Sequence, residues 1–282
     1  MAKPGVKQIQ IHKYAPSGSS NGPDLLAVEE PLEIRLGFGP LTERTQRSIA
    51  ITMRTPGHDF DLAVGFLFTE GIIQSKKQIL SVKYCFDDGK VEEAENIVRV
   101  ELQENVVFDT GKLNRHFYTT SSCGVCGKAS IEAIESVSCF NLHQNKTTIK
   151  TSLIPKLPNI LRTQQLVFEH TGGLHAAALF SNDGELIAMK EDVGRHNAVD
   201  KLIGAALYAD LLPLENGILA LSGRASFELI QKASMAGIPI IAAVGAPSSL
   251  AVELAASAGL TLIGFVRDGR FNVYSEFQRV VE

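Results

Sequence analysis

From Gly217 to Val266 the sequence reads GILALSGRASFELIQKASMAGIPIIAAVGAPSSLAVELAASAGLTLIGFV. Short apolar runs alternate here with segments whose apolar residues recur at helical spacing. The pattern predicts strands at 217–221, 239–244 and 260–266, and helices at 225–236 and 248–257. Strands that alternate with helices of this length form βαβ units around a parallel sheet. We therefore expect an α/β fold with a parallel core.

The residues on either side extend this unit. Two apolar runs, 175–180 and 185–190, flank an Asp-Gly turn and predict a β-hairpin. An amphipathic helix is predicted at 197–208. After the turn Arg267-Asp268-Gly269-Arg270, a last strand is predicted at 271–274.

Upstream of the hairpin the pattern is weaker. We expect a loop that contains a Cys-x-x-Cys pair, then a short helix at 128–137. From Ser138 to Gln165 we expect a polar connection with little regular structure. The whole of 111–282 is expected to be one α/β domain with the cysteine loop at its start.

The first part of the chain predicts a smaller α+β domain over residues 30–110. Asp59 is a candidate helix N-cap, and Gly71 is a stop signal. Residues 13–29 are rich in Ser, Gly and Pro, so we expect residues 1–29 to be a flexible tail. Strands are predicted at 31–36, 48–54, 79–86 and 96–102, with a helix at 59–68.

Composition excludes several classes of protein. The chain has 282 residues, a formal net charge of −4 and a pI of about 6.0. A nucleic-acid partner would need a basic surface, so none is expected. The start lacks a signal-peptide pattern, and prolines interrupt the longest apolar region, 237–266, so we expect no membrane partner. Four cysteines in a chain this long are too few for a disulfide scaffold, which favours the reducing cytoplasm.

The segment Cys123-Gly124-Val125-Cys126-Gly127 is the strongest chemical signal. A thiolate is the reactive form of cysteine, and a helix N-terminus favours anions. The pair lies just ahead of a helix predicted to begin at Lys128, which adds a positive charge. This arrangement favours a nucleophilic cysteine that accepts a sulfur atom and passes it on.

Three other interpretations of the pair stay open. It could be half of a zinc site, although Cys85 and Cys139 are isolated and no second ligand pair follows. It could be a thioredoxin-like redox pair, although that motif belongs near the start of a βαβ unit. It could also be two inert buried residues.

Anion-binding groups follow three predicted strands. Ligands of parallel α/β sheets bind at the carboxyl ends of the strands. Backbone donors at a helix start and paired arginines suit phosphate groups. Each group alone is a weak signal, but together they favour a nucleotide-like anion. The three groups are Ser222-Gly223-Arg224, Gly245-Ala246-Pro247-Ser248-Ser249 and Arg267-Asp268-Gly269-Arg270.

A polar stretch from Glu191 to Lys201 precedes the helix predicted at 197–208. Asn197 is a candidate N-cap. Arg195 and His196 exceed what a cap requires, and His175 opens the predicted hairpin. Either histidine could instead have a purely structural role.

Together these motifs resemble the formate dehydrogenase accessory sulfurtransferase family, FdhD. The similarity runs in order from about residue 30 to the end. The matching segments are Cys123–Gly127, His170–His175, Val193–Lys201, Ser222–Glu228 and Gly264–Arg270.

The resemblance implies a sulfurtransferase. Such proteins take persulfide sulfur from a cysteine desulfurase and pass it to the molybdenum (or tungsten) bis-molybdopterin guanine dinucleotide cofactor, which formate dehydrogenase requires. Cys123 would carry the persulfide and Cys126 would assist. The formate dehydrogenase catalytic subunit would be the client. No resident metal is implied.

The resemblance also implies a fold and a ligand site. The C-terminal domain would have the three-layer α/β/α fold of cytidine deaminases, and the protein would be a homodimer. The turn from Phe265 to Arg270 would lie at the guanine nucleotide. The implied cofactor-binding residues are Phe265, Val266, Arg267, Asp268, Gly269, Arg270, Ser222, Gly223, Arg224, His196, Arg195 and His175.

Two departures from related patterns bear on these roles. The turn Gly245-Ala246-Pro247-Ser248 differs from the family's Ser-Ala-Pro-Thr. The deaminase zinc signature is absent, so the fold would not carry deaminase chemistry. Two alternative functions stay open. The chain could be a chaperone that binds the cofactor without sulfur chemistry, or a thiol–disulfide oxidoreductase.

Overall fold

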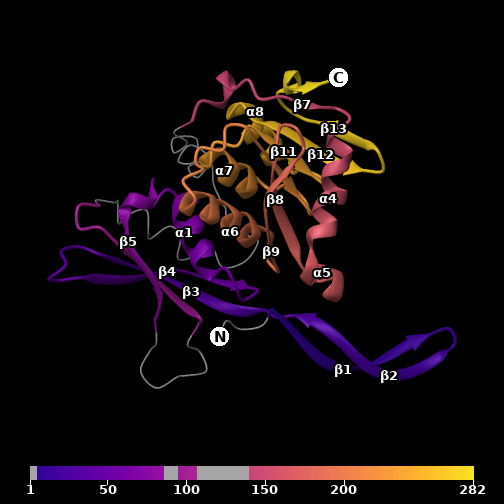
Figure 1. Cartoon of the computed structure of the whole chain (residues 1–282), viewed down its shortest axis with the longest axis horizontal. Helices are drawn as coiled ribbons and strands as arrows, with labels where there is room; N and C mark the ends of the chain where they lie inside the picture. The colour runs from indigo at the N-terminus through magenta and orange to yellow at the C-terminus, as the bar shows by residue number, and fades with distance from the viewer. Residues whose placement is uncertain (1–4, 86–94, 107–139) are drawn as a thin grey trace.

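A computed structural model describes residues 5–85, 95–106 and 140–282 (Figure 1). Its C-terminal part is built on a six-stranded mixed sheet with the order β13-β12-β11-β10-β8-β9. The neighbours β10, β11 and β12 run parallel, which confirms the predicted α/β class and parallel core. The strands are β8 (His175–Ser181), β9 (Leu186–Asp192), β10 (Gly217–Leu221), β11 (Ile240–Ala243), β12 (Thr261–Arg267) and β13 (Arg270–Val273).

Helices cover both faces of this sheet. On one face lie α6 (Arg195–Tyr208), α7 (Phe227–Met235) and α8 (Ser249–Ser257), and on the other lies α4 (Leu157–Gln164) (Figure 1). Alternate strand residues supply the two cores, as the twofold period of a strand requires. In β10, Leu219 packs into the first core and Ile218 into the second.

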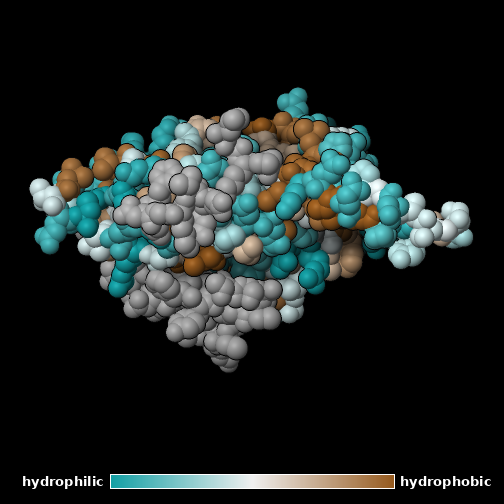
Figure 2. Space-filling model, turned by 90° about the horizontal axis from the view of Figure 1, so that it is seen from below, coloured by the Kyte–Doolittle hydropathy of each residue, from teal (hydrophilic) through white to brown (hydrophobic). Residues whose placement is uncertain are grey.

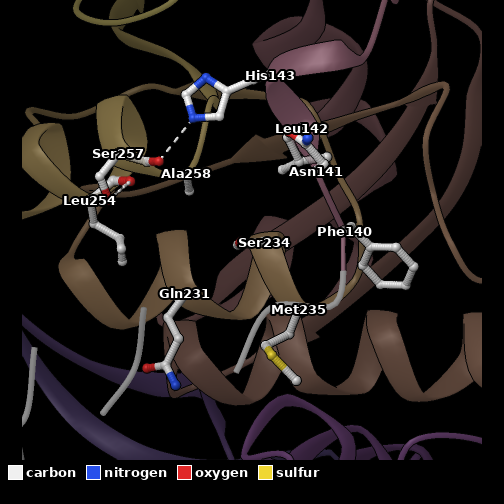
Figure 3. Close-up of a pocket in the computed structure, with 10 residues that line it drawn as sticks. All are labelled: Phe140, Asn141, Leu142, His143, Gln231, Ser234, Met235, Leu254, Ser257 and Ala258. Atoms are coloured by element: carbon white, nitrogen blue, oxygen red, sulfur yellow. Dashed lines mark hydrogen bonds between the residues drawn. The ribbon is translucent and has the colours of Figure 1, made fainter. Parts of the chain in front are cut away.

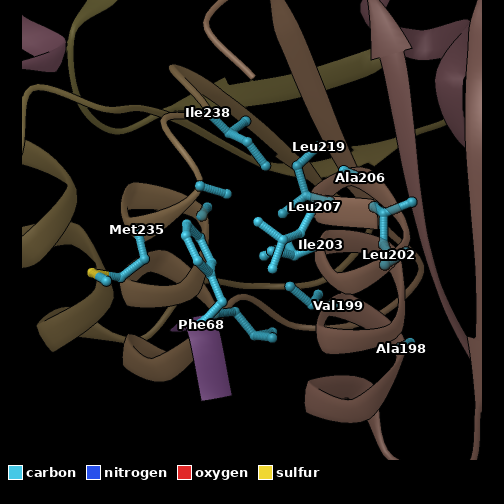
Figure 4. Packing of buried hydrophobic residues seen from close by; sticks show 14 of the residues in the cluster. Phe68, Ala198, Val199, Leu202, Ile203, Ala206, Leu207, Leu219, Met235 and Ile238 are labelled. Carbon is cyan, nitrogen blue, oxygen red and sulfur yellow. The ribbon is translucent and has the colours of Figure 1, made fainter. Parts of the chain in front are cut away.

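The N-terminal part is a four-stranded sheet with the order β4-β3-β6-β5. The helix α1 packs between this sheet and α6, α7 of the C-terminal part, so one hydrophobic core spans both. Figure 4 shows Phe68 of α1 beside Ile203 and Leu207 of α6 and Met235 of α7. The elements are β3 (Glu30–Phe38), β4 (Thr45–Arg54), α1 (Asp59–Thr69), β5 (Ile79–Tyr84) and β6 (Ile97–Leu102). The predicted boundary at residue 110 stays a prediction.

Two glycines allow α1 and α6 to touch. A Cβ added at Gly65 would lie 1.9 Å from the carbonyl oxygen of Asp200, and one at Gly204 would lie 1.9 Å from that of Asp61. The helix backbones are therefore in direct contact, which no residue with a side chain permits at these positions.

We expect Gly204→Ala to destabilise the protein. The methyl group must push α6 from α1, and such overpacking costs about 1–3 kcal/mol, more than the ~1 kcal/mol that alanine gains in helix propensity. Urea unfolding measures the difference. Gly22→Ala is the control, because a Cβ there meets nothing within 4 Å; equal midpoints for both variants would contradict the prediction.

The prediction that residues 1–29 form a flexible tail is wrong for residues 5–29, which the structure describes. Residues 6–27 form a hairpin of β1 (Val6–Ala15) and β2 (Gly18–Ala27), paired in register throughout. The hairpin projects from the body of the protein (Figure 1). The residues at its tip are mostly of hydrophilic or intermediate hydropathy, drawn in teal to white in Figure 2. The Ser- and Gly-rich segment that suggested disorder is the second strand. Cross-strand backbone hydrogen bonds, which composition does not reveal, order it.

Three further expectations are corrected. The helix N-cap of α1 is His58, not Asp59, and that of α6 is Gly194, because Asn197 lies inside the helix. The polar connection from Ser138 to Gln165 contains regular structure over its described part. It holds β7 (Ile149–Lys150) and α4, and α5 (Leu166–Thr171) follows it, while β7 pairs with β14 (Val280–Val281). The helix predicted at 128–137 lies outside the described residues. In the described part, no helix is long and apolar enough to cross a membrane.

Candidate functional site

The carboxyl ends of β10, β11 and β12 meet, as predicted. The amide of Gly245 donates to the carbonyl of Gly223 at 3.0 Å, and the amide of Phe265 donates to the carbonyl of Gly245 at 3.1 Å. These bonds continue the ladder beyond the strands and hold the three polar turns side by side. Phe265 has φ 55° and lies in the irregularity between Gly264 and Arg267 that shifts the pairing of β12 with β13.

His175 lies against the first of these turns. Its ring Nδ1 is 3.2 Å from the place that a Cβ at Gly223 would occupy, so a side chain there would push the ring by a few tenths of an ångström. The hydroxyl of Ser222 accepts a hydrogen bond from the amide of Ala176 at 2.8 Å. Ser222 and Gly223 therefore attach the end of β10 to the start of β8.

Arg195 and His196 begin α6 beside His175. Burial lowers the pKa of His175 from its ordinary value of 6.5, and the charges of Arg195 and His196 lower it further, against a smaller opposing effect of Asp192. The Arg195 Nε is buried without a hydrogen-bond partner in the described part of the chain. The positive charge of Arg195 suits an anion, which would also satisfy the unpaired guanidinium nitrogen.

We expect Arg195→Met to raise the pKa of His175, because it removes a nearby positive charge. Since the folded protein binds this proton less readily than the unfolded chain, stability from His175 is present at neutral pH. It is lost as the pH falls below about 6.5. An NMR titration of the His175 ring measures the shift. Arg47→Met, at an exposed position on β4, is the control, and an unchanged His175 pKa in Arg195→Met would contradict the prediction.

The Nε2 atom of the His196 ring faces the start of α7. This atom lies 3.1 Å from the hydroxyl of Ser226 and 3.7 Å from the carboxylate of Glu228. Hydrogen bonding from His196 is the largest cause that lowers the pKa of Glu228 to about 2. The sequence resemblance included Ser226 and Glu228 in a motif, but no role was assigned to either.

The rest of the same polar stretch is structural. The ammonium of Lys201 lies 2.7 Å from the carboxylate of Asp192 and donates to the carbonyl of Thr55 at 2.8 Å. The side-chain amide of Asn197 donates to Asp192 and to the carbonyl of Met53. These buried groups attach β4 to α6 and so hold Arg195 and His196 in place. The spacing of residues 197 and 201 by four was the signal that they share a helix face.

The outer groups of the predicted site lie farther along the sheet edge. Arg224 is exposed and packs on Gly245. Asp268 and Gly269, with φ of 52° and 73°, form the two-residue turn between β12 and β13. Arg267 and Arg270 flank it and are exposed, whereas Val266 is fully buried and packs in the second core.

The distance along this edge has a consequence for ligand size. Two strands, β11 and β10, separate the Arg267–Arg270 turn from His175 on β8. Three interstrand spacings correspond to about 14 Å. An anion that contacts both ends must therefore be elongated, as a nucleotide is.

The predicted catalytic residues, Cys123 and Cys126, lie outside the described residues. Cys85, at the end of β5, is the one described cysteine and is a half-buried free thiol. Among the described residues no cluster of three or more His, Cys, Asp or Glu could hold a metal ion.

A cavity of about 270 Å³ lies elsewhere, between α7, α8 and the segment 140–143 (Figure 3). His143 lines it and its Nε2 lies 3.0 Å from the carbonyl oxygen of Ser257. Because α7 and α8 run back from the strand ends, their last turns lie at the opposite edge of the sheet. This cavity is therefore not part of the predicted site.

The fold is shared with another protein of solved structure. A solved structure of a candidate formate dehydrogenase accessory protein from Desulfotalea psychrophila matches with a TM-score of 0.74. The match covers 99% of this chain and 100% of that chain at 24% identity. At this identity the likeness shows the fold alone.

Sequence comparison is more specific. The model of the FdhD/NarQ family matches residues 27–281. "Sulfur carrier protein FdhD" of Mycolicibacterium paratuberculosis is 51% identical over 261 residues, 92% of each chain. The protein of the same name from Sulfolobus acidocaldarius is 42% identical over 277 residues, 98% of each chain. The chain belongs to the FdhD/NarQ family.

Proposed function

We propose that this chain is a sulfur carrier that matures formate dehydrogenase. The observation that carries the proposal is its 51% identity, over nearly its full length, to a relative named as a sulfur carrier protein. The named role of the solved relative, formate dehydrogenase accessory protein, indicates the client. The formate dehydrogenase catalytic subunit is therefore the proposed partner.

Cys123 is the proposed carrier. It accepts sulfur as a persulfide from a cysteine desulfurase, and Cys126 assists its release. The sequence supports this step, because Cys123 and Cys126 precede Lys128 in a glycine-rich motif suited to a thiolate. The same proposal includes a cytoplasmic homodimer with a C-terminal domain related in fold to the cytidine deaminases.

The proposed substrate is the molybdenum (or tungsten) bis-molybdopterin guanine dinucleotide cofactor. The edge of the sheet fits such an elongated anion. Arg195 has a buried nitrogen in need of a partner and lies beside His175, and the exposed Arg267 and Arg270 lie about 14 Å from His175 across β11 and β10. The segment Phe265–Arg270 would hold the guanine nucleotide, with Ser222, Gly223 and Arg224 between this segment and His175.

Sulfur loading tests the proposal directly. Incubation of the full chain with a cysteine desulfurase and cysteine is expected to add one sulfur atom to Cys123, which a reductant removes. Mass spectrometry of the intact protein and of its peptides measures the addition. Cys123→Ala is the matched control. A wild-type chain that gains no sulfur, or gains it equally in Cys123→Ala, would reject the carrier role of Cys123.

A further inference from the structure

Ser226 and Glu228 lie behind the substrate site rather than in it. Ser226 is the N-cap residue of α7, yet its side chain makes no capping hydrogen bond. A serine at an N-cap normally accepts from a backbone amide of the first helical turn. Here the hydroxyl lies 3.1 Å from the Nε2 of His196 instead.

The hydrogen-bond directions follow from the chemistry of the three groups. The Glu228 carboxylate, whose pKa is lowered to about 2, is ionised at neutral pH and can only accept. The Nε2 of His196 lies 3.7 Å from this carboxylate, and a lone pair on Nε2 would face the negative charge unfavourably. The Nε2 of His196 must then carry the hydrogen that points toward Ser226 and Glu228.

The other ring nitrogen of His196 has no partner in the described part of the chain. The side chain is 32% exposed and stands beside Arg195 and His175. In an imidazole with a hydrogen on Nε2, Nδ1 carries a lone pair and accepts hydrogen bonds. It is therefore the one ring atom of His196 that remains for a ligand.

Stability alone gives a weak reason for this arrangement. Glu228 is 44% exposed, and an exposed ion pair contributes little to the free energy of folding. Orientation of a histidine ring by a neighbouring carboxylate is, in contrast, a common device at functional sites.

We propose that Ser226 and Glu228 are positioning residues, which hold His196 as its Nε2–H tautomer so that Nδ1 accepts a hydrogen bond from an N–H or O–H donor of the substrate. The contact between Nδ1 and the substrate rests on the proposed function, whereas the tautomer does not.

The first experiment uses the protein alone. Nitrogen-15 NMR of the His196 ring is expected to show Nε2 protonated and Nδ1 unprotonated once the ring is neutral. In Ser226→Ala/Glu228→Gln, a mixture of tautomers is expected, because the glutamine amide can also donate. Glu253→Gln, an exposed glutamate on α8, is the control and leaves the tautomer unchanged. An Nδ1–H tautomer in the wild type, or an unchanged ratio in the double variant, would overturn the proposal.

The second experiment measures formate dehydrogenase maturation in cells. The double variant and His196→Ala are each expected to lower it by about tenfold. The triple variant should fall no further, because all three residues act through one nitrogen. Sulfur loading of Cys123 and the unfolding midpoint should stay at wild-type values in every variant. If His196→Ala matures formate dehydrogenase as well as the wild type does, the proposed contact between His196 and the substrate is overturned. If the wild-type protein itself takes up no sulfur, the carrier function is rejected instead.

Discussion

Cys123→Ala is expected to abolish the maturation of formate dehydrogenase. The variant lacks the one atom that the proposal requires to hold transferable sulfur, and no neighbouring group replaces a thiolate in this chemistry. Formate oxidation in extracts of cells that carry only the variant measures the loss. Urea unfolding is expected to give the wild-type midpoint, so that the loss of maturation is assigned to sulfur chemistry and not to the fold.

Variants of the other cysteines distinguish the sulfur carrier from the alternative functions. Cys85→Ala is the control, and it should mature the enzyme normally. Cys126→Ala should lower maturation without preventing sulfur loading of Cys123. Equal and complete loss from Cys123→Ala and Cys126→Ala, with reduction of protein disulfides by the wild type, would indicate a thiol–disulfide oxidoreductase. Normal maturation by Cys123→Ala, combined with retained cofactor binding, would indicate a chaperone.

Lys201→Met is expected to destabilise the protein by about 3–5 kcal/mol, the usual cost of leaving one member of a buried ion pair alone. Lys201 is 2% exposed and Asp192 is fully buried, so water cannot replace the lost partner. The same change frees the carbonyl of Thr55, which weakens the attachment of β4 to α6. Urea unfolding followed by circular dichroism measures the free energy.

Two comparisons make this prediction specific. Lys146→Met, at an exposed lysine, should change the unfolding free energy by less than about 0.5 kcal/mol. Asp192→Leu/Lys201→Met should be more stable than Lys201→Met, because it removes the uncompensated carboxylate. If Lys201→Met matched the wild type, the buried contacts of Lys201 with Asp192 and Thr55 would not stabilise the fold.

Much of the fold could be predicted because hydrophobic periodicity is local. Every strand and helix predicted between Gly217 and Tyr274 is present, with ends that differ by a few residues. The hairpin from His175 was equally accessible, because its Asp-Gly turn is a local conformational signal. The hairpin of β1 and β2 could not be predicted, because a polar strand is recognised only from the strand with which it pairs.

The sequence by itself determined the family of this chain and the candidate groups for its chemistry: a cysteine pair in a glycine-rich motif and polar turns after three parallel strands. Only the tertiary structure decided which polar residues lie beside the proposed site and which are buried in the fold. Arg195 and His196 adjoin Asn197 in the chain, but α1 covers one face of α6 by direct backbone contact at Gly65 and Gly204. Asn197 and Lys201 are buried on hydrogen bonds to Met53 and Thr55, and Arg195 and His196 are left beside the strand ends. The helical period separates neighbouring side chains, but packing alone selects the face that is buried.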